Sequence, residues 1–295
     1  MIYECCPYFN EKLIAGLKIN CELPDRRLII GESDYTFRKA YKGFTFDLQA
    51  PSVDYRKYEV EDVFKKFSFF RKNLNRVYLK FWPGISEYDR HRWSSHAWFN
   101  EATQRNLVSQ VEQVKDTDFV IFSDIDEFVD PRHWPQIEEL VKKHGIITIP
   151  VYNTMFYFNL RIGEYGGPKN FSYRIFIMTG KVYRNLKYSS DELRRKGERG
   201  QLFSEVYCPE TFMGFHHSWI GDINQLVNKI NSFAHTLKEL GIPEDLDNEG
   251  IKNFLITCVN NKESVIVGHE LYIDRDMPLL EPVAKGLNPY SEFVL

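Results

Sequence analysis

The stretch that decides the fold is Phe119-Val-Ile-Phe-Ser-Asp-Ile-Asp-Glu-Phe-Val-Asp130, in which an apolar run ends in a group of acids. Residues 118–123 are predicted to form a buried strand, because the positions inside this segment are apolar on both faces. Four carboxylates follow, at positions 124, 126, 127 and 130. Unpaired carboxylates this close disfavour each other's ionisation and are costly to bury. A divalent cation among them would remove that cost, because Mg²⁺ and Mn²⁺ prefer oxygen ligands.

The acids of this segment are expected to have different roles. Asp126 is the predicted metal ligand, Asp124 would contact a ribose or an outer-shell water, and Glu127 would orient the site. An alternative is that the acids only cap the next helix, for which Asp130-Pro131 is a plausible start. That alternative explains Asp130 and leaves Asp124 and Asp126 unexplained.

Strand-like and helix-like patterns alternate around this segment. Short apolar runs typical of strands occur at residues 27–32, 77–82, 146–151 and 155–160. Apolar residues recur at helical spacing over 95–115 and 223–240, and a further helix is expected over 247–260. This alternation predicts an α/β fold with a mostly parallel, Rossmann-like central sheet flanked by helices. Ligands bind beyond the carboxyl ends of such strands, which puts Glu32 on the same edge as Asp124.

No repeat, low-complexity tract or linker divides the 295 residues, so a single domain is predicted. Residues 1–130 would form a nucleotide-binding half, and residues 131–295 an acceptor half with the C-terminal helices. The N-terminal segment lacks the basic start and apolar stretch of a signal peptide. No window of the sequence is long and apolar enough to span a membrane. We therefore expect a soluble, cytoplasmic protein without a transmembrane segment.

Charge and cysteine content exclude other classes of protein. A formal net charge of −3 gives no global basic field for nucleic acid. Short basic runs such as Arg194-Arg195-Lys196 are expected to be solvated helix faces or loops. The five cysteines match neither a zinc site nor a disulfide framework, so reduced and mostly buried thiols are expected.

Six segments carry a resemblance to a known family. They are residues 1–11 (MIYECCPYFNE), 31–37 (GESDYTF), 99–106 (FNEATQRN), 119–128 (FVIFSDIDEF), 214–219 (GFHHSW) and 232–236 (SFAHT). In this order they resemble glycosyltransferase family 17, whose best-known members add β-1,4-linked N-acetylglucosamine to the mannose of glycoproteins. Two segments depart from the family pattern. Phe128-Val129 replaces the usual Ile-Pro, and Phe215 stands where Trp is usual, followed by His216 and a second histidine.

The resemblance implies an inverting, metal-dependent transferase of the GT-A type. Such an enzyme would move a sugar, most simply N-acetylglucosamine, from a UDP-sugar donor to a glycan acceptor. Mn²⁺ or Mg²⁺ would neutralise the charge that develops on the UDP leaving group. Alternatives are another donor such as UDP-glucose or UDP-galactose, a sugar-nucleotide pyrophosphorylase, and a glycan-binding module without catalysis.

The resemblance and the GT-A type also imply roles for residues outside the acidic segment. His216 would be a further metal ligand, with a structural histidine as the alternative. Arg105 would reach the diphosphate or form a surface salt bridge. Glu32 would contact the uridine or cap the next turn. Asp222 is the favoured catalytic base, because an acid often follows the histidine segment in the family. The other candidates for the base are Asp191, Glu192, Glu205 and Glu210.

Overall fold

The computed structural model describes residues 1–38, 40–59, 96–163, 172–198, 206–232, 237, 240–266 and 268–295. The strands in these residues are β1 Ile2–Tyr8, β2 Arg26–Ser33, β3 Val53–Tyr58, β4 Phe119–Phe122, β5 Glu127–Val129, β6 Ile146–Met155, β7 Leu160–Ile162, β8 Ser172–Thr179, β9 Gly214–Ser218 and β10 Leu271–Ile273. The helices are α1 Lys12–Asn20, α5 His96–Val108, α6 Trp134–His144, α7 Gly180–Arg184, α8 Ser190–Glu198, α9 Ile223–Ser232, α10 Asn248–Asn261 and α11 Glu281–Ala284, with 3-10 turns η1 Pro131–His133 and η3 Tyr290–Phe293.

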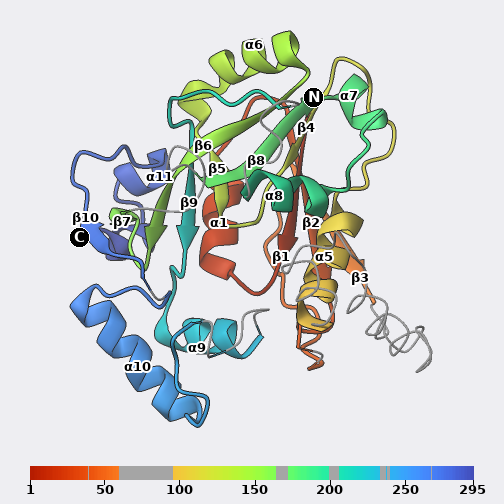
Figure 1. Ribbon diagram of the computed structural model, residues 1–295. Coiled ribbons are helices and arrows are strands. Elements are labelled where there is room, and N and C mark those ends of the chain that lie inside the picture. Colours follow the sequence, from red (N-terminus) through yellow and green to blue (C-terminus); the bar gives the residue numbers. More distant parts are fainter. Residues whose placement is uncertain are drawn as a thin grey trace, which may run out of the picture.

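One mixed sheet forms the centre of the molecule (Figure 1). Its order in the described residues is β10-β7-β6-β8-β4-β1-β2-β3, and β9 joins beside β6 with β5 beside β9. Strand β1 lies between β2 and β4 and is parallel to both, and β3 is parallel to β2. Strand β8 pairs antiparallel with β4 and β6, and β7 pairs antiparallel with β6 and β10. The α/β class is confirmed. The predicted parallel pairing is right for β1 to β4 and wrong for β8 with its neighbours and for β7 with its neighbours.

The predicted strands differ in outcome. The run 27–32 lies within β2, and the run 118–123 contains β4, whose side chains are all buried. The run 155–160 is not a strand. Met155 ends β6, Phe156 has a φ of 65°, and the N–H of Tyr157 bonds to the carbonyl of Met155 at 2.7 Å. Burial of this turn, rather than a strand, explains its apolar residues. Residues 77–82 lie outside the described residues.

The predicted helices lie at the expected positions, but their ends differ from those predicted. The helix expected over 95–115 is α5, which ends at Val108, and the helix expected over 247–260 is α10. The helix expected from residue 223 is α9, described as far as Ser232. Residues 233–236 and 238–239 lie outside the described residues, and so does His235 of the family segment.

Helices cover both faces of the sheet, because successive side chains along each buried strand point to opposite faces. Cys6 of β1 packs with Ala15 of α1, while the adjacent Cys5 packs in a separate cluster with Val108 of α5 and Leu193 of α8. Helix α6 covers another part of the sheet through a cluster that includes both β4 and β6 side chains. Helices α9 and α10 pack around the β6–β7 turn, at the lower end of the view in Figure 1.

All five cysteines are free thiols, and four of them are buried, as expected for reduced thiols. In the described part of the chain, no helix combines the length and the apolar character that crossing a membrane requires.

Candidate functional site

The acidic segment lies at the carboxyl edge of the parallel half of the sheet. Cys5 of β1 is opposite Phe122 of β4, and the N–H of Ser123 bonds to the carbonyl of Cys5 at 3.3 Å. Residues 123–127, the acidic turn, therefore begin where β4 leaves the sheet. The carboxyl ends of parallel strands are where ligands bind in such sheets, as the sequence predicted.

A second pairing brings the late histidine to this turn. Strand β5 starts at Glu127 and runs antiparallel to β9, with Glu127 directly opposite His216. The N–H of His217 also bonds to the carbonyl of Asp126, at 2.8 Å. Strand β9 can lie this close to β5 because residue 214 is a glycine. A Cβ there would lie 2.3 Å from the carbonyl oxygen of Phe128.

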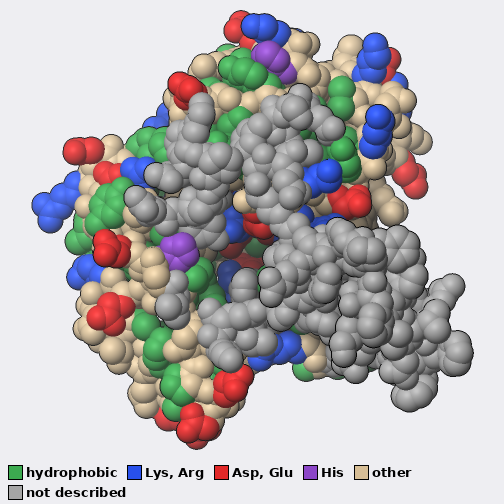
Figure 2. Space-filling model, in the orientation of Figure 1, with side chains coloured by type: hydrophobic (Ala, Val, Ile, Leu, Met, Phe, Trp, Pro, Cys, Tyr) green, Lys and Arg blue, Asp and Glu red, His purple; other side chains and the backbone are tan. Residues whose placement is uncertain are grey.

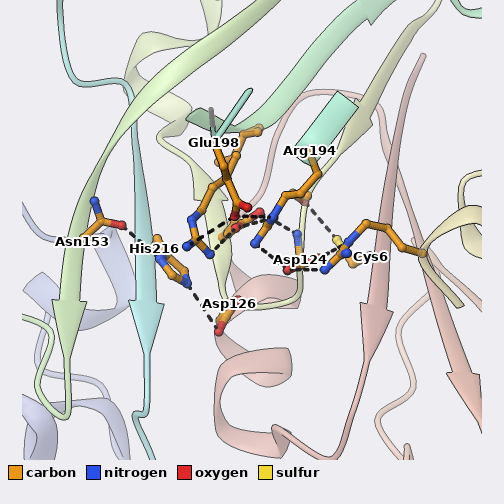
Figure 3. Close-up of polar contacts among 12 residues, drawn as sticks. Cys6, Asp124, Asp126, Asn153, Arg194, Glu198 and His216 are labelled. Atoms are coloured by element: carbon orange, nitrogen blue, oxygen red, sulfur yellow. Dashed lines mark hydrogen bonds and ion pairs between the residues drawn. The ribbon is translucent and has the colours of Figure 1, made fainter. Parts of the chain in front are cut away.

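Asp126 and His216 face each other across this pairing. Asp126 Oδ2 lies 3.8 Å from His216 Nε2, and both residues are buried (Figure 3). One ligand atom each from Asp126, Glu127 and His216 fall within 4.8 Å of one another. Metal–oxygen bonds of about 2.1 Å would let one cation contact both Asp126 and His216. The structure thus brings together the two residues predicted as metal ligands.

His216 is held in the form that binds metals. Its Nδ1 lies 3.0 Å from Asn153 Oδ1, which can only accept, so Nδ1 carries the proton and Nε2 presents a lone pair toward Asp126. Burial, helped by the charge of Arg174, lowers the pKa of His216 to about 3. The imidazole is therefore neutral at physiological pH. A hydrogen bond that orients a ligating histidine is typical of metal sites.

Arginines neutralise the first acid of the turn. Arg105 donates to both carboxylate oxygens of Asp124, at 3.1 and 3.0 Å, and Arg194 Nη2 lies 2.9 Å from Asp124 Oδ2. Burial alone raises the pKa of Asp124, but the charges of Arg105 and Arg194 outweigh it and hold the pKa well below its usual value. Asp124 is thus an anion paired with two buried guanidinium groups.

Arg105 is a buried member of the ion-pair cluster at the acidic turn. Its guanidinium is buried and also pairs with Glu101 at 2.8 Å and Asp191 at 3.1 Å. The predicted surface salt bridge is therefore wrong, because Arg105 pairs with three carboxylates in a buried position, and its contact with a diphosphate stays a prediction. Asp191, a candidate base, is engaged by the same arginine and by Arg195 at 3.2 Å.

Glu127 closes the acidic turn. Its Oε2 accepts the N–H of Asp124 at 2.8 Å, and its Oε1 lies 2.7 Å from Arg194 Nη1 without the alignment of a hydrogen bond. Arg174 is farther away, at 3.9 Å. Burial raises the pKa of Glu127, and the charge of Arg194 partly offsets that effect. This geometry fits the orienting role that the sequence predicted for Glu127.

Glu32 holds the loop that follows β2. Its buried carboxylate accepts from the N–H of Thr45 at 2.9 Å, the N–H of Phe46 at 3.1 Å and the hydroxyl of Tyr55 at 2.6 Å, and it pairs with Lys42. Protein donors therefore occupy both of its oxygens. This arrangement favours the capping alternative over the predicted contact with uridine.

Asp222 caps a helix. Its Oδ1 accepts the N–H groups of Asn224 at 2.9 Å and Gln225 at 3.0 Å, which are the first turn of α9. The prediction that Asp222 is the catalytic base is therefore not supported, because its carboxylate is exposed and turned to the helix start. Glu192 likewise caps the start of α8 by accepting the N–H of Ser189 at 2.8 Å. Glu205 lies outside the described residues.

Sequence reasoning missed several cations of the site. Arg194 was expected on a solvated face, yet its side chain is 9% exposed and pairs with Asp124 and Glu127. Lys229 Nζ, from α9, lies 3.5 Å from Asp126 Oδ2 and 3.7 Å from Glu11 Oε1. Local charge runs gave no signal for these contacts, because they depend on how α8 and α9 pack against the sheet edge.

A cavity of about 260 Å³ lies beside Asp126. Its walls combine aromatic rings with charged groups, and they include Phe9, Glu11, Lys42, Asp126, Trp219 and Lys229. Trp219 has a φ of 59°, a strained conformation for a bulky residue and one found at functional sites. Figure 2 shows acidic and basic side chains at the floor of a hollow near the centre of one face.

Comparisons with known proteins leave the family open. No family model matches the chain, and no curated protein matches it. Among solved structures, residues 1–349 of S. aureus TarS align with a TM-score of 0.32 and 11% identity, over 88% of this chain and 73% of that one. The same fragment in complex with UDP-GlcNAc gives 0.33 and 10%, over 88% and 71%. S. aureus TarS in another structure gives 0.32 and 10%, over 88% and 43%.

TM-scores this low carry no argument about fold or function. The resemblance to glycosyltransferase family 17 therefore stays a prediction.

Proposed function

We propose that this chain is a metal-dependent glycosyltransferase of the GT-A type, which moves a sugar from a UDP-sugar to a glycan acceptor. N-acetylglucosamine is the sugar to test first. The observation that carries the proposal is the pair of Asp126 Oδ2 and His216 Nε2, 3.8 Å apart at the carboxyl edge of the sheet. A cavity adjoins the pair.

The donor atoms suit Mn²⁺ or Mg²⁺ bound together with a diphosphate. Asp126 offers a carboxylate and His216 a neutral imidazole of fixed tautomer, whereas Asp124 and Glu127 are already neutralised by Arg105 and Arg194. Two protein ligands leave most of the coordination shell for phosphate oxygens and water, as is usual for Mg²⁺. When bound, the cation would neutralise the charge that develops on the leaving diphosphate.

The residues of the chain itself would bind and orient the substrates. Asp126 and His216 hold the metal, and Glu127 keeps the acidic turn closed through the N–H of Asp124. Asp124 retains lone pairs that can accept a ribose hydroxyl. The cavity between Phe9 and Trp219 gives room for a substrate ring beside Asp126. Aromatic walls with polar groups suit a nucleobase or a sugar.

The test is UDP release from a panel of UDP-sugars with Mn²⁺, measured with and without a chelator. We expect chelator-sensitive release from one donor, and its loss in Asp126→Asn. Asp130→Asn is the matched control, because Asp130 is a buried acid of the same segment that caps η1 by accepting the N–H of Arg132 at 3.0 Å. Asparagine caps a helix nearly as well as aspartate, so this variant should keep full turnover.

Full turnover by Asp126→Asn would refute the assignment of the metal site. Consumption of a nucleoside triphosphate with a sugar 1-phosphate would instead identify a pyrophosphorylase. Stoichiometric glycan binding without turnover would identify a binding module.

A further inference from the structure

A lysine is buried directly beneath the acidic turn. The side chain of Lys18, from α1, is 1% exposed, and its ammonium pairs with Glu4 of β1 at 2.7 Å. The other oxygen of Glu4 pairs with Arg26 at 3.0 Å. Burial alone raises the pKa of Glu4, but Lys18 and Arg26 outweigh it and lower the pKa, so Glu4 is a carboxylate.

The remaining protons of Lys18 are directed at the two ends of the acidic turn. The ammonium donates to Ser123 Oγ at 3.1 Å and to the carbonyl oxygen of Glu127. Ser123 directly precedes Asp124, and Glu127 directly follows Asp126. An ammonium group has three donors, and Glu4, Ser123 and Glu127 supply an acceptor for each of them.

Lys18 is not needed to neutralise the charge of Glu4. Arg26 already pairs with Glu4, so the three charged groups Glu4, Lys18 and Arg26 sum to one positive charge. Burying an extra cation is costly unless something compensates for it. The compensation lies in the turn, where Lys18 donates to the hydroxyl of Ser123 and to the carbonyl of Glu127. An apolar side chain could fill the same space beside Phe128, whose ring lies 5.1 Å from the ammonium.

We propose that Lys18 is a positioning residue for the metal site, which fixes the backbone of the acidic turn so that Asp126 faces His216. The proposal rests on the function proposed above. Lys18 does not touch the metal ligands' side chains. It acts at the two ends of the turn, through the hydroxyl of Ser123 and through the backbone carbonyl of Glu127, the residue that pairs with His216 in the β5–β9 ladder.

Two variants test the proposal, and each removes one of the two cations that pair with Glu4. Lys18→Met removes the bonds to the turn, whereas Arg26→Met removes a contact with Glu4 and bonds to the carbonyls of Lys18 and Ile19, away from the turn. Both leave Glu4 with a single cation, so both should lower the unfolding midpoint. Mn²⁺ binding in the presence of UDP, measured by electron paramagnetic resonance, separates them. We expect a loss of about tenfold in Mn²⁺ affinity for Lys18→Met, as for other residues that orient metal ligands.

Arg26→Met should retain the wild-type affinity within about twofold. Equal Mn²⁺ affinity in wild type and Lys18→Met would overturn the positioning role, and so would an equal loss in both variants. If wild type binds no Mn²⁺ with UDP, the proposed function itself fails.

A third variant covers the case in which Lys18→Met does not fold. Ser123→Ala removes the hydroxyl that Lys18 contacts and leaves every charge in place. It should fold and lower the Mn²⁺ affinity in the same direction. Unchanged affinity in Ser123→Ala would then count against the proposal.

Discussion

Acidification should destabilise this protein through two adjacent buried histidines, His216 and His217. Burial lowers the pKa of each to about 3, from an ordinary value of 6.5. Between these values the unfolded chain binds protons that the folded protein does not bind, so stability rises with pH in this window. The stabilisation is fully present above about pH 6.5 and is lost as the pH falls toward 3.

The magnitude follows from the same pKa values. Lowering the pH from about 7.5 to about 5.5 moves each unfolded histidine from mostly neutral to mostly charged, which costs about 1.4 kcal/mol per group. Both histidines together should therefore remove about 3 kcal/mol. A domain has roughly 5–15 kcal/mol of total stability, so the loss is readily measured.

The matched variant is His217→Phe. His217 lies among Phe128, Phe158 and Phe215, with ring centroids 5.5, 4.9 and 5.3 Å away, so a phenyl ring suits the space. The variant loses the 2.7 Å bond between His217 Nδ1 and Thr154 Oγ1 at every pH. That cost cancels when the two pH values are compared.

Urea unfolding at both pH values, followed by tryptophan fluorescence with a chelator present, measures the effect. The free energy of unfolding should fall by about 3 kcal/mol in wild type and by about half as much in His217→Phe. Carboxyls titrating in the same range affect both proteins equally. An identical pH dependence in the two proteins would refute the assignment of a depressed pKa to His217.

Three further predictions concern the proposed metal site and the residues that support it. Asn153→Ala should lower the affinity for Mn²⁺ with UDP by roughly 10–100-fold, because it frees the ring and tautomer of His216; calorimetric titration measures this, and an unchanged affinity would contradict it. Gly214→Ala should lower the thermal midpoint and abolish Mn²⁺ binding, because a Cβ would meet the Phe128 carbonyl at 2.3 Å and separate β5 from β9; a wild-type midpoint would exclude that reason. Arg194→Met should cost about 3–5 kcal/mol in urea unfolding, because it leaves Asp124 and Glu127 without a shared buried cation; a loss below about 1 kcal/mol would show that other groups neutralise them.

The acidic turn could be predicted because its signal is local, whereas His216 was implied by the family resemblance. An apolar run that ends in carboxylates marks a strand and the edge where it ends, and the family segment around His216 pointed to the same site. The pairing of Glu127 with His216 then confirmed that these distant segments meet.

Contacts made by distant helices could not be predicted in the same way. Arg194 has the local pattern of a solvated helix face, and only the packing of α8 turns it toward Asp124. Glu32 at the end of β2 looked available for a ligand, but the loop that returns to it supplies donors from Thr45 and Phe46. Residues 155–160 have the apolar pattern of a strand although Phe156 forms a turn, because a buried turn is as apolar as a strand.

The ladder between β5 and β9 has a consequence for how the protein matures. Residues 1–130 contain Asp126 but not its imidazole partner, which reaches the turn only when the strand at 214–218 docks. During synthesis on a ribosome, the proposed cation would thus meet Asp126 without His216 until more than two hundred residues had emerged. Loading with metal would report that the two halves of the chain had joined.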